Sequence, residues 1–293
     1  METEAYRTLP ASWYVSPKLY ELEQDVIFKK GWHLVGPITK FTETPIDYEI
    51  AGNAFQVQKQ PDSDVVEVYY VNDKGVQTSP VRFEQSRTGL VFVCFDDNAP
   101  SMEEYFGGQL TELIDSVDFT KLPYRRSIKY TGKFNWKTMI DGYQECLHCK
   151  YTHPSFYKRY PSEFYAVENY TNFSRHLQDP AYREDGLFLF FFPICTLNVY
   201  GGGMSMFRTC PISATECRME FDYYYNGSDE DFEEYYNFTR KVATEDYDLC
   251  VDAQKNLERG IYQTGILNPN KENGVLYYQG LVKDKVLDAV AAK

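Results

Sequence analysis

Residues 135–154 read NWKTMIDGYQECLHCKYTHP and contain two of the four histidines of the chain, His148 and His153. The pattern from Lys137 to Leu147 predicts a helix. The two histidines are five residues apart, so they do not share a helix face, which repeats at i+3 and i+4. Pro154 disfavours helical backbone at His153, so His148 can end the helix while His153 turns back from the loop. Both imidazoles could then bind one metal ion; the alternative is two unrelated polar histidines.

A second segment supplies a candidate third ligand. Residues 229–259 have a helical pattern, and Gly260 stands where a helix commonly ends. Asp246 falls on the apolar side of this helix, among Val242, Leu249, Cys250, Ala253 and Leu257. A buried carboxylate is very costly unless a metal, a cation or several hydrogen bonds compensate it. A structural pair with Lys or Arg is the alternative, and Glu245 is expected to point away into solvent.

Two imidazoles and one carboxylate form a recognised metal-ligand set. On an octahedral ion they leave adjacent positions open, the facial arrangement of non-haem Fe(II) oxygenases. If the three side chains meet, His148, His153 and Asp246 would hold one Fe(II) per chain; the residues by themselves leave the two alternatives above open.

The rest of the chain predicts an α+β fold with an antiparallel sheet. Helical and strand patterns occur in blocks and not in βαβ alternation. The helical blocks are 17–31, 101–116, 137–147 and 229–259, and the strand blocks are 32–94, 125–134 and 186–225.

Charge and composition indicate which classes of binding partner and which cellular location to expect. The net charge of −13 and pI of about 4.9 argue against nucleic acid and anionic membranes. No run of 18 apolar residues predicts a membrane span, and METEAYRTLP at 1–10 is not a secretory signal. We therefore expect a cytoplasmic protein whose seven cysteines are free thiols, with Cys146 and Cys149 packing at a helix end.

Three segments resemble one family. Residues 135–154 resemble the signature of the catalytic domain of Rieske non-haem iron ring-hydroxylating oxygenase alpha subunits, in the choline and carnitine oxygenase branch. EDYDLCVDAQKNLERGIYQTG at 245–265 and LPASWYVSPKLYELEQDVIFKKGWHLVGP at 9–37 resemble the same branch, in the same order.

The resemblance implies a helix-grip catalytic domain, in which an antiparallel sheet holds a long C-terminal helix. It also implies the ligand set His148, His153 and Asp246. Glu145 matches the acidic residue that bridges the iron site to the cluster of a neighbouring subunit, and it is assigned a catalytic role together with Asp141.

The sequence departs from the family in one respect. A Rieske domain binds its [2Fe–2S] cluster through Cys-x-His and Cys-x-x-His. His33 and His176, the two histidines left over, have no Cys two or three residues before them. The chain is therefore expected to lack the cluster. We divide it into a lead-in (1–40), a truncated Rieske-like β module (41–100) and a mononuclear iron catalytic domain (101–293).

Three functions follow as hypotheses. The first is an iron oxygenase that acts on a small organic substrate with O₂, in a homo- or hetero-oligomer whose cluster-bearing chain supplies the electrons. The second is an iron enzyme that takes electrons from its substrate or uses the metal as a Lewis acid. The third is a regulatory subunit of a Rieske oxygenase without catalysis.

Overall fold

The computed structural model describes residues 6–179, 181 and 186–292, and its largest element is a seven-stranded antiparallel sheet. The strand order is β8 (Tyr124–Gly132), β14 (Cys217–Tyr225), β13 (Gly203–Pro211), β12 (Cys195–Tyr200), β11 (Leu187–Phe191), β10 (Phe173–Leu177) and β9 (Ala166–Asn169). The expected α+β class with an antiparallel sheet is confirmed.

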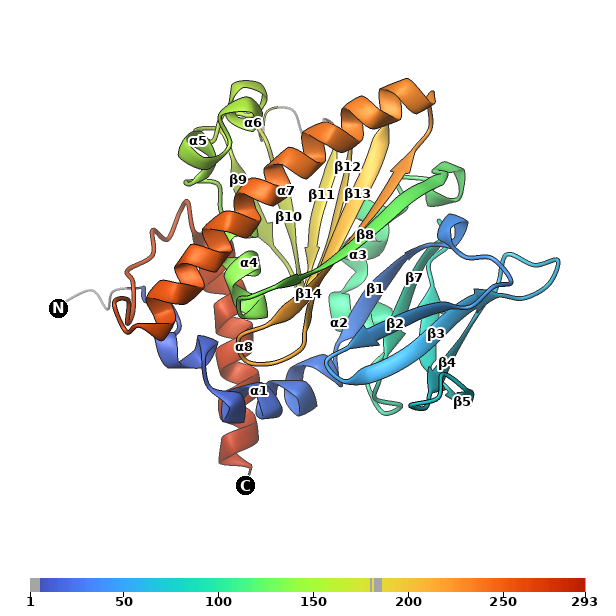
Figure 1. Cartoon of the computed structure of the whole chain (residues 1–293), viewed down its shortest axis with the longest axis horizontal. Helices are drawn as coiled ribbons and strands as arrows, with labels where there is room; N and C mark the ends of the chain where they lie inside the picture. Colours follow the sequence, from blue (N-terminus) through green and yellow to red (C-terminus); the bar gives the residue numbers. More distant parts are fainter. Residues whose placement is uncertain (1–5, 180, 182–185, 293) are drawn as a thin grey trace.

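Two smaller antiparallel sheets form a β module beside the large sheet (Figure 1). One has the order β1 (Trp32–Pro37), β7 (Leu90–Cys94), β6 (Arg82–Gln85). The other has the order β2 (Ile46–Ile50), β3 (Asn53–Lys59), β4 (Val66–Val71), β5 (Gln77–Pro80). Strand β1 precedes residue 41 and pairs with β7, so this module takes in part of the proposed lead-in; the three-part division of the chain remains a proposal.

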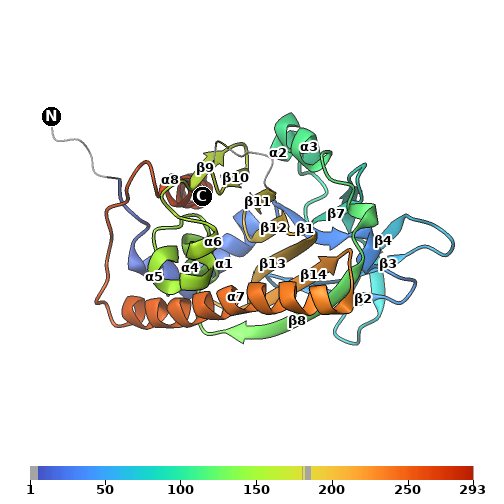
Figure 2. The ribbon, with the colours of Figure 1, turned by 90° about the horizontal axis from the view of Figure 1, so that it is seen from above.

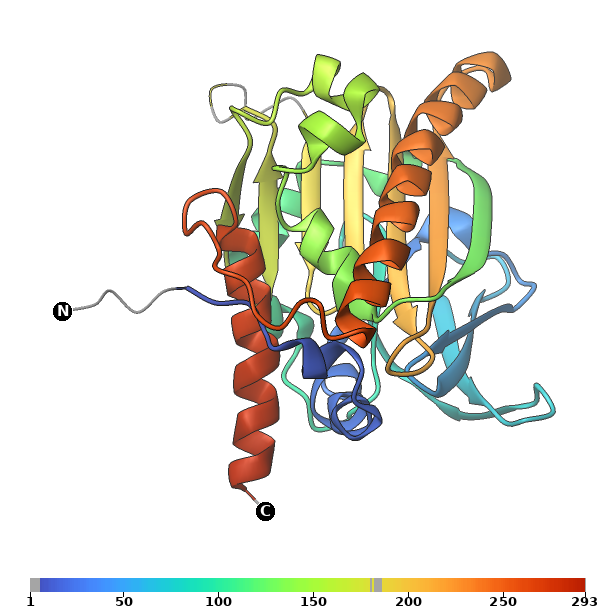
Figure 3. The ribbon, with the colours of Figure 1, turned by 60° about the vertical axis from the view of Figure 1, so that its left-hand side comes forward.

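Helices cover one face of the large sheet. The long helix α7 (Asp229–Glu258) crosses that face, and α4 (Trp136–Tyr143), α5 (Cys149–Thr152) and α6 (Pro154–Arg159) lie beside it (Figures 2 and 3). The other helices are α1 (Pro17–Glu23), α2 (Met102–Phe106), α3 (Gly108–Ile114) and α8 (Asn273–Ala291). Of the helices that the structure describes, none has the length and apolar content to cross a membrane.

The expected helices differ in length from the observed ones. The long helix is confirmed, and Gly260 follows it with a φ of +68°. The helix expected over 17–31 leaves α-geometry after Glu23 and continues as a π-turn to Phe28. The helix expected over 137–147 ends at Tyr143, because the Glu145 carboxylate accepts the Leu147 N–H that a continuing helix would direct to its own backbone.

A buried ion cluster joins the large sheet to the β module. On β13 and β14 the alternate residues Arg208, Glu220 and Asp222 point away from α7 and are buried. Arg208 is 2.9 Å from Glu220 and 3.1 Å from Asp222, and Lys40 is 2.7 Å from Asp222. Arg208 also donates to the carbonyl of Val35 in β1 at 3.0 Å. Even positions of these strands thus bind the module, while odd positions face α7.

The Asn-Trp-Lys motif anchors α4. Asn135 caps the helix by accepting the Lys137 N–H at 2.9 Å, and its own N–H donates to Gln254 of α7 at 3.0 Å. The buried Glu23 of α1 accepts from Trp136 Nε1 at 2.9 Å and from Lys137 Nζ at 2.6 Å. The motif therefore fixes the helix that leads into the histidine segment.

Candidate metal centre

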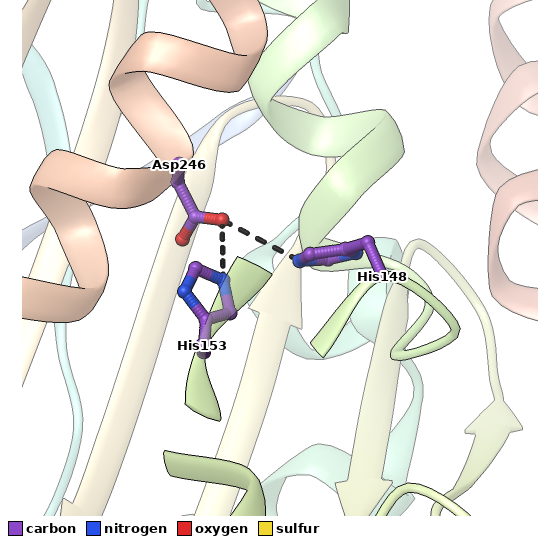
Figure 4. Close-up of side chains that lie close together, drawn as sticks. All are labelled: His148, His153 and Asp246. Carbon is purple, nitrogen blue, oxygen red and sulfur yellow. Dashed lines mark hydrogen bonds and ion pairs between the residues drawn. The ribbon is translucent and has the colours of Figure 1, made fainter. Parts of the chain in front are cut away.

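Three side chains from separate elements converge beside α7 (Figure 4). Asp246 projects from α7, His148 immediately precedes α5, and His153 lies between α5 and α6. Asp246 Oδ1 is 2.8 Å from His153 Nε2 and 3.4 Å from His148 Nε2. One ligand atom of each residue lies within 4.8 Å of the others, a spacing that one metal ion can span. No other group of three His, Cys, Asp or Glu in the described part of the chain meets that criterion.

Each histidine also contacts a second carboxylate through its Nδ1 atom. Glu145 Oε1 contacts His148 Nδ1, and Glu245 Oε2 is 2.8 Å from His153 Nδ1. A carboxylate on Nδ1 fixes the ring and leaves Nε2 for a metal. The expectation that Glu245 is solvated is wrong, because His153 lies along the flank of α7 and reaches Asp246 and the preceding residue together.

The charges of the site are strongly coupled. Burial disfavours protonation of His148, but hydrogen bonds with Asp246 and Glu145 outweigh it and raise its pKa to about 10. Burial opposes ionisation of Asp246, and the two imidazoles outweigh that effect and lower its pKa. Without a metal, the carboxylates are thus neutralised by imidazolium; a bound dication would take over that role.

Cys146 and Cys149 form a disulfide that encloses His148, with Cα atoms 5.1 Å apart. The expectation of free thiols is wrong for this pair, because the chain turns between the end of α4 and the start of α5 and brings the two side chains together. The other five cysteines are free and buried.

A cavity of about 160 Å³ lies between α7, α4, α6 and the large sheet, and the three candidate ligands line it. Aromatic rings dominate its wall: Tyr143, Phe156, Tyr160, Tyr165, Phe188, Tyr200, Phe207, Phe221, Tyr223 and Phe238. Among the described residues, its wall contains no Lys or Arg. Apart from the metal position, the cavity therefore offers mainly aromatic faces to an organic molecule.

A second cavity, of about 360 Å³, reaches His148 and Asp246 from the side of the N-terminal segment and α8. Glu145 lines both cavities, whereas Asp141 lines only this one. Asp141 accepts hydrogen bonds from Tyr14 at 2.8 Å and from Gln279 at 2.6 Å.

Asp141 is thus enclosed by the fold. Burial raises its pKa to about 6, although Tyr278, Gln279 and Tyr14 stabilise the carboxylate by hydrogen bonds. In the described residues it has no hydrogen bond or ion pair with His148, His153 or Asp246. A catalytic role for Asp141 stays a prediction; the contacts indicate that it fixes α4 against α8 and Tyr14.

Sequence reasoning missed two further residues of the first cavity, Tyr165 and His176. Both are buried, and the Tyr165 hydroxyl contacts His176 Nδ1. Strand β10, which carries His176, has a pattern too short for the sequence to have revealed it. The scarcity of histidine was the one available signal.

Comparisons with known proteins agree on one family. The model of the family "Ring hydroxylating alpha subunit (catalytic domain)" matches residues 119–179 and 168–288. The carnitine monooxygenase oxygenase subunit of Acinetobacter baumannii is 24% identical over 353 residues, covering 94% of each chain. Choline monooxygenase of Arabidopsis thaliana is 22% identical, covering 89% of this chain and 79% of that one.

Solved structures share the fold. The quaternary ammonium Rieske monooxygenase CntA in complex with an inhibitor has a TM-score of 0.84 and 21% identity, with 96% of each chain covered. Naphthalene 1,2-dioxygenase from Rhodococcus sp. has a TM-score of 0.72 and 12% identity, covering 95% of this chain and 94% of that one.

Proposed function

Since the chain belongs to the ring-hydroxylating alpha-subunit family of oxygenases, we propose that His148, His153 and Asp246 hold one Fe(II) and that the protein oxidises a small organic substrate with O₂. The observation that supports this most strongly is the convergence of three ligand atoms within 4.8 Å, beside an aromatic cavity. The family match includes all three residues.

The donor set fits iron in its chemistry as well as its spacing. Two neutral imidazoles and one carboxylate suit Fe(II), whose bound form would supply the redox centre for O₂. Glu145 and Glu245 hold the Nδ1 protons of the two histidines, which keeps both Nε2 atoms unprotonated toward the ion. The aromatic wall orients the substrate and excludes water from the site.

The substrate class follows from the wall of the first cavity. Away from the metal position and its two histidines, the described wall offers no Lys or Arg that could pair with a substrate anion. Aromatic faces attract organic cations as well as neutral rings. We therefore propose a neutral or cationic substrate, and the quaternary ammonium compounds named for the carnitine and choline relatives are reasonable first candidates.

We further propose that the electrons come from a cluster-bearing partner chain. The sequence contains no Cys-x-x-His, and its one Cys-x-His, Cys146-Leu147-His148, includes the proposed iron ligand His148, so the two motifs that together hold a Rieske cluster are not both present. The structure of a related quaternary ammonium Rieske monooxygenase is described as giving insight into inter-subunit electron transfer. Glu145, which lines both cavities and contacts His148, is the residue that such a route would use.

A second candidate is an iron enzyme that takes its electrons from the substrate. The observation in its favour is that both carboxylate oxygens of Glu145 already have partners in this chain, His148 Nδ1 and the Leu147 N–H. Under this candidate Glu145 only orients His148.

Metal analysis tests the iron site. Anaerobically reconstituted protein should bind about one Fe(II) per chain and show no [2Fe–2S] absorption bands. Asp246→Ala should lose the iron with its fold intact, whereas Asp248→Ala, an exposed acid on the same helix, should keep it. Full iron occupancy in Asp246→Ala would show that the ligand set is wrong.

Single-turnover O₂ consumption separates the electron sources. If a partner supplies electrons, the iron-loaded protein should consume O₂ with substrate only when a reduced cluster-bearing chain is added. Glu145→Gln should then retain iron but lose this partner-dependent O₂ consumption. Turnover with substrate and O₂ alone would favour the second candidate. Iron binding with no turnover in either condition would indicate a regulatory subunit.

A further inference from the structure

Among the described residues that line the first cavity, two have a buried polar atom without a hydrogen-bond partner, the Tyr223 hydroxyl and Nε2 of His176. His176 lies in β10 with 3% of its surface exposed, and it lines the cavity. Its Nδ1 contacts the Tyr165 hydroxyl, while its Nε2 has no hydrogen-bond partner among the residues that the structure describes. Native proteins pair most such groups, so an orphaned one calls for an explanation.

His176 lies on the face of the large sheet that α4 covers, where the cavity is. Side chains alternate along a strand, and His176 shares its face with Ser174, which accepts a hydrogen bond from Gln144 at the end of α4 at 3.5 Å. The centroid of its ring lies 4.7 Å from that of Tyr143 of α4, so the two rings are in contact. Nε2 is the ring nitrogen farther from the backbone, and Tyr165 occupies the nearer one.

Counting hydrogen-bond donors indicates the tautomer. If the Tyr165 O–H donates to Nδ1, its proton has a partner, and Nε2 carries the ring proton. In the reverse arrangement the phenol proton and Nε2 both lack a partner, since no other hydrogen bond of Tyr165 O–H occurs in the described structure. The first arrangement satisfies one more polar group. Burial also lowers the pKa of His176 to about 3, so the ring is neutral and carries one proton.

From this geometry, and building on the proposed function, we propose that His176 is a substrate-binding residue whose Nε2–H donates to an acceptor oxygen of the substrate, with Tyr165 holding the tautomer. A neutral donor in a wall without Lys or Arg suits an uncharged oxygen, as in a hydroxyl or carbonyl group.

Two matched probes test the hydrogen bond without turnover. Acetophenone and α-methylstyrene differ chiefly in whether a carbonyl oxygen or a CH₂ group is present. Dissociation constants measured by calorimetry on the full-length protein should favour acetophenone by about tenfold, the size expected when a buried donor gains or lacks its acceptor. Equal affinities, or no binding of either probe, would overturn the proposal.

Variants assign that preference to the two residues. His176→Phe should remove it, and Tyr165→Phe should reduce it, because the imidazole then loses its fixed tautomer. His33→Phe is the matched control: it replaces another buried histidine, which belongs to the β module and does not line the cavity, and it should keep the preference. An unchanged preference in His176→Phe would contradict the proposal.

The tautomer has its own readout. Nitrogen-15 NMR of histidine-labelled protein should show His176 with a protonated Nε2 and an unprotonated Nδ1, and Tyr165→Phe should change that spectrum. A protonated Nδ1 in the native protein would also overturn the proposal. None of these measurements depends on iron, so a failure of the metal assignment and a failure of this one are distinguishable.

Discussion

At the scale of single residues, the site is built from pairs of carboxylate and imidazole. Asp246 faces both Nε2 atoms, while Glu145 and Glu245 each face one Nδ1. This arrangement assigns Glu145 and Glu245 equivalent positions, although they are 100 residues apart in the sequence. The neighbouring acids of α7 therefore have different roles. Asp246 faces the proposed metal position, and Glu245 contacts the Nδ1 atom of His153 on the other side of that ring.

Glu245→Gln should weaken Fe(II) binding by about ten- to a hundredfold, because the amide is a poorer acceptor for the His153 Nδ1 proton. Competition with a chromophoric chelator would measure the affinity. Glu234→Gln, an exposed position on the same helix, is the control and should bind as the native protein does. Native affinity in Glu245→Gln would mean that the contact with His153 has no part in metal binding.

At the scale of elements, the segment between α4 and α6 is short, and each of its constraints affects a ligand. The Cys146–Cys149 disulfide closes a small loop around His148. By lowering the entropy of the unfolded chain, a bridge that closes a loop of this size raises the free energy of unfolding by about 2 kcal/mol. The same bridge limits the positions that His148 can take in the folded protein.

Replacing both cysteines by serine should therefore lower iron affinity as well as thermal stability. Treatment of the native protein with dithiothreitol should lower both to a similar extent, because it breaks the S–S bond and leaves two thiols while the dithiol is oxidised. The doubly substituted protein should not respond to the reagent. If the native protein also fails to respond, and thiol titration shows that it was reduced, the bridge is irrelevant to the site.

The ion cluster between the large sheet and the β module is the other element-scale feature. Arg208→Ala should destabilise the protein by about 3–5 kcal/mol, because it removes the fully buried cation that Glu220 and Asp222 share and leaves Asp222 with Lys40 alone. Denaturant unfolding would measure the loss. Lys121→Ala breaks an exposed pair with Asp118 and should leave the midpoint unchanged. A similar midpoint for both variants would show that the cluster does not hold the module.

For the molecule as a whole, buried neutral histidines link folding to pH. Burial lowers the pKa of His33 from 6.5 to about 4, against a hydrogen bond to the Phe28 carbonyl. Below pH 6.5 His33 becomes protonated in the unfolded chain, whereas in the folded protein it stays neutral down to about pH 4. Stability is therefore complete above pH 6.5 and falls as the pH drops through that window.

The unfolding free energy of the native protein should thus fall from pH 7 to pH 5 by about 2 kcal/mol more than that of His33→Gln. Comparing the two proteins cancels the other groups, including Asp141, whose raised pKa acts in the opposite direction. Urea unfolding at the two pH values provides the measurement. Parallel losses in both proteins would place the proton uptake elsewhere.

Local patterns determined much of this protein. The 3.6-residue repeat over α7, the alternation in the strands and the residue types in 135–154 depend on neighbours in the chain, so the sequence alone indicated the α+β class, the long helix and the three converging residues. The resemblance to the alpha-subunit family rested on those same segments.

Tertiary packing decided the rest. Whether Glu245 meets His153 depends on how a loop lies along α7, more than 90 residues away in the chain. The disulfide depends on a turn that Glu145 forces by capturing a backbone N–H. The orphaned nitrogen of His176 results from which partners the fold brought near and which it did not. These contacts depend on which residues the fold brings together in space, and the hydrophobic periodicity of the sequence does not contain that information.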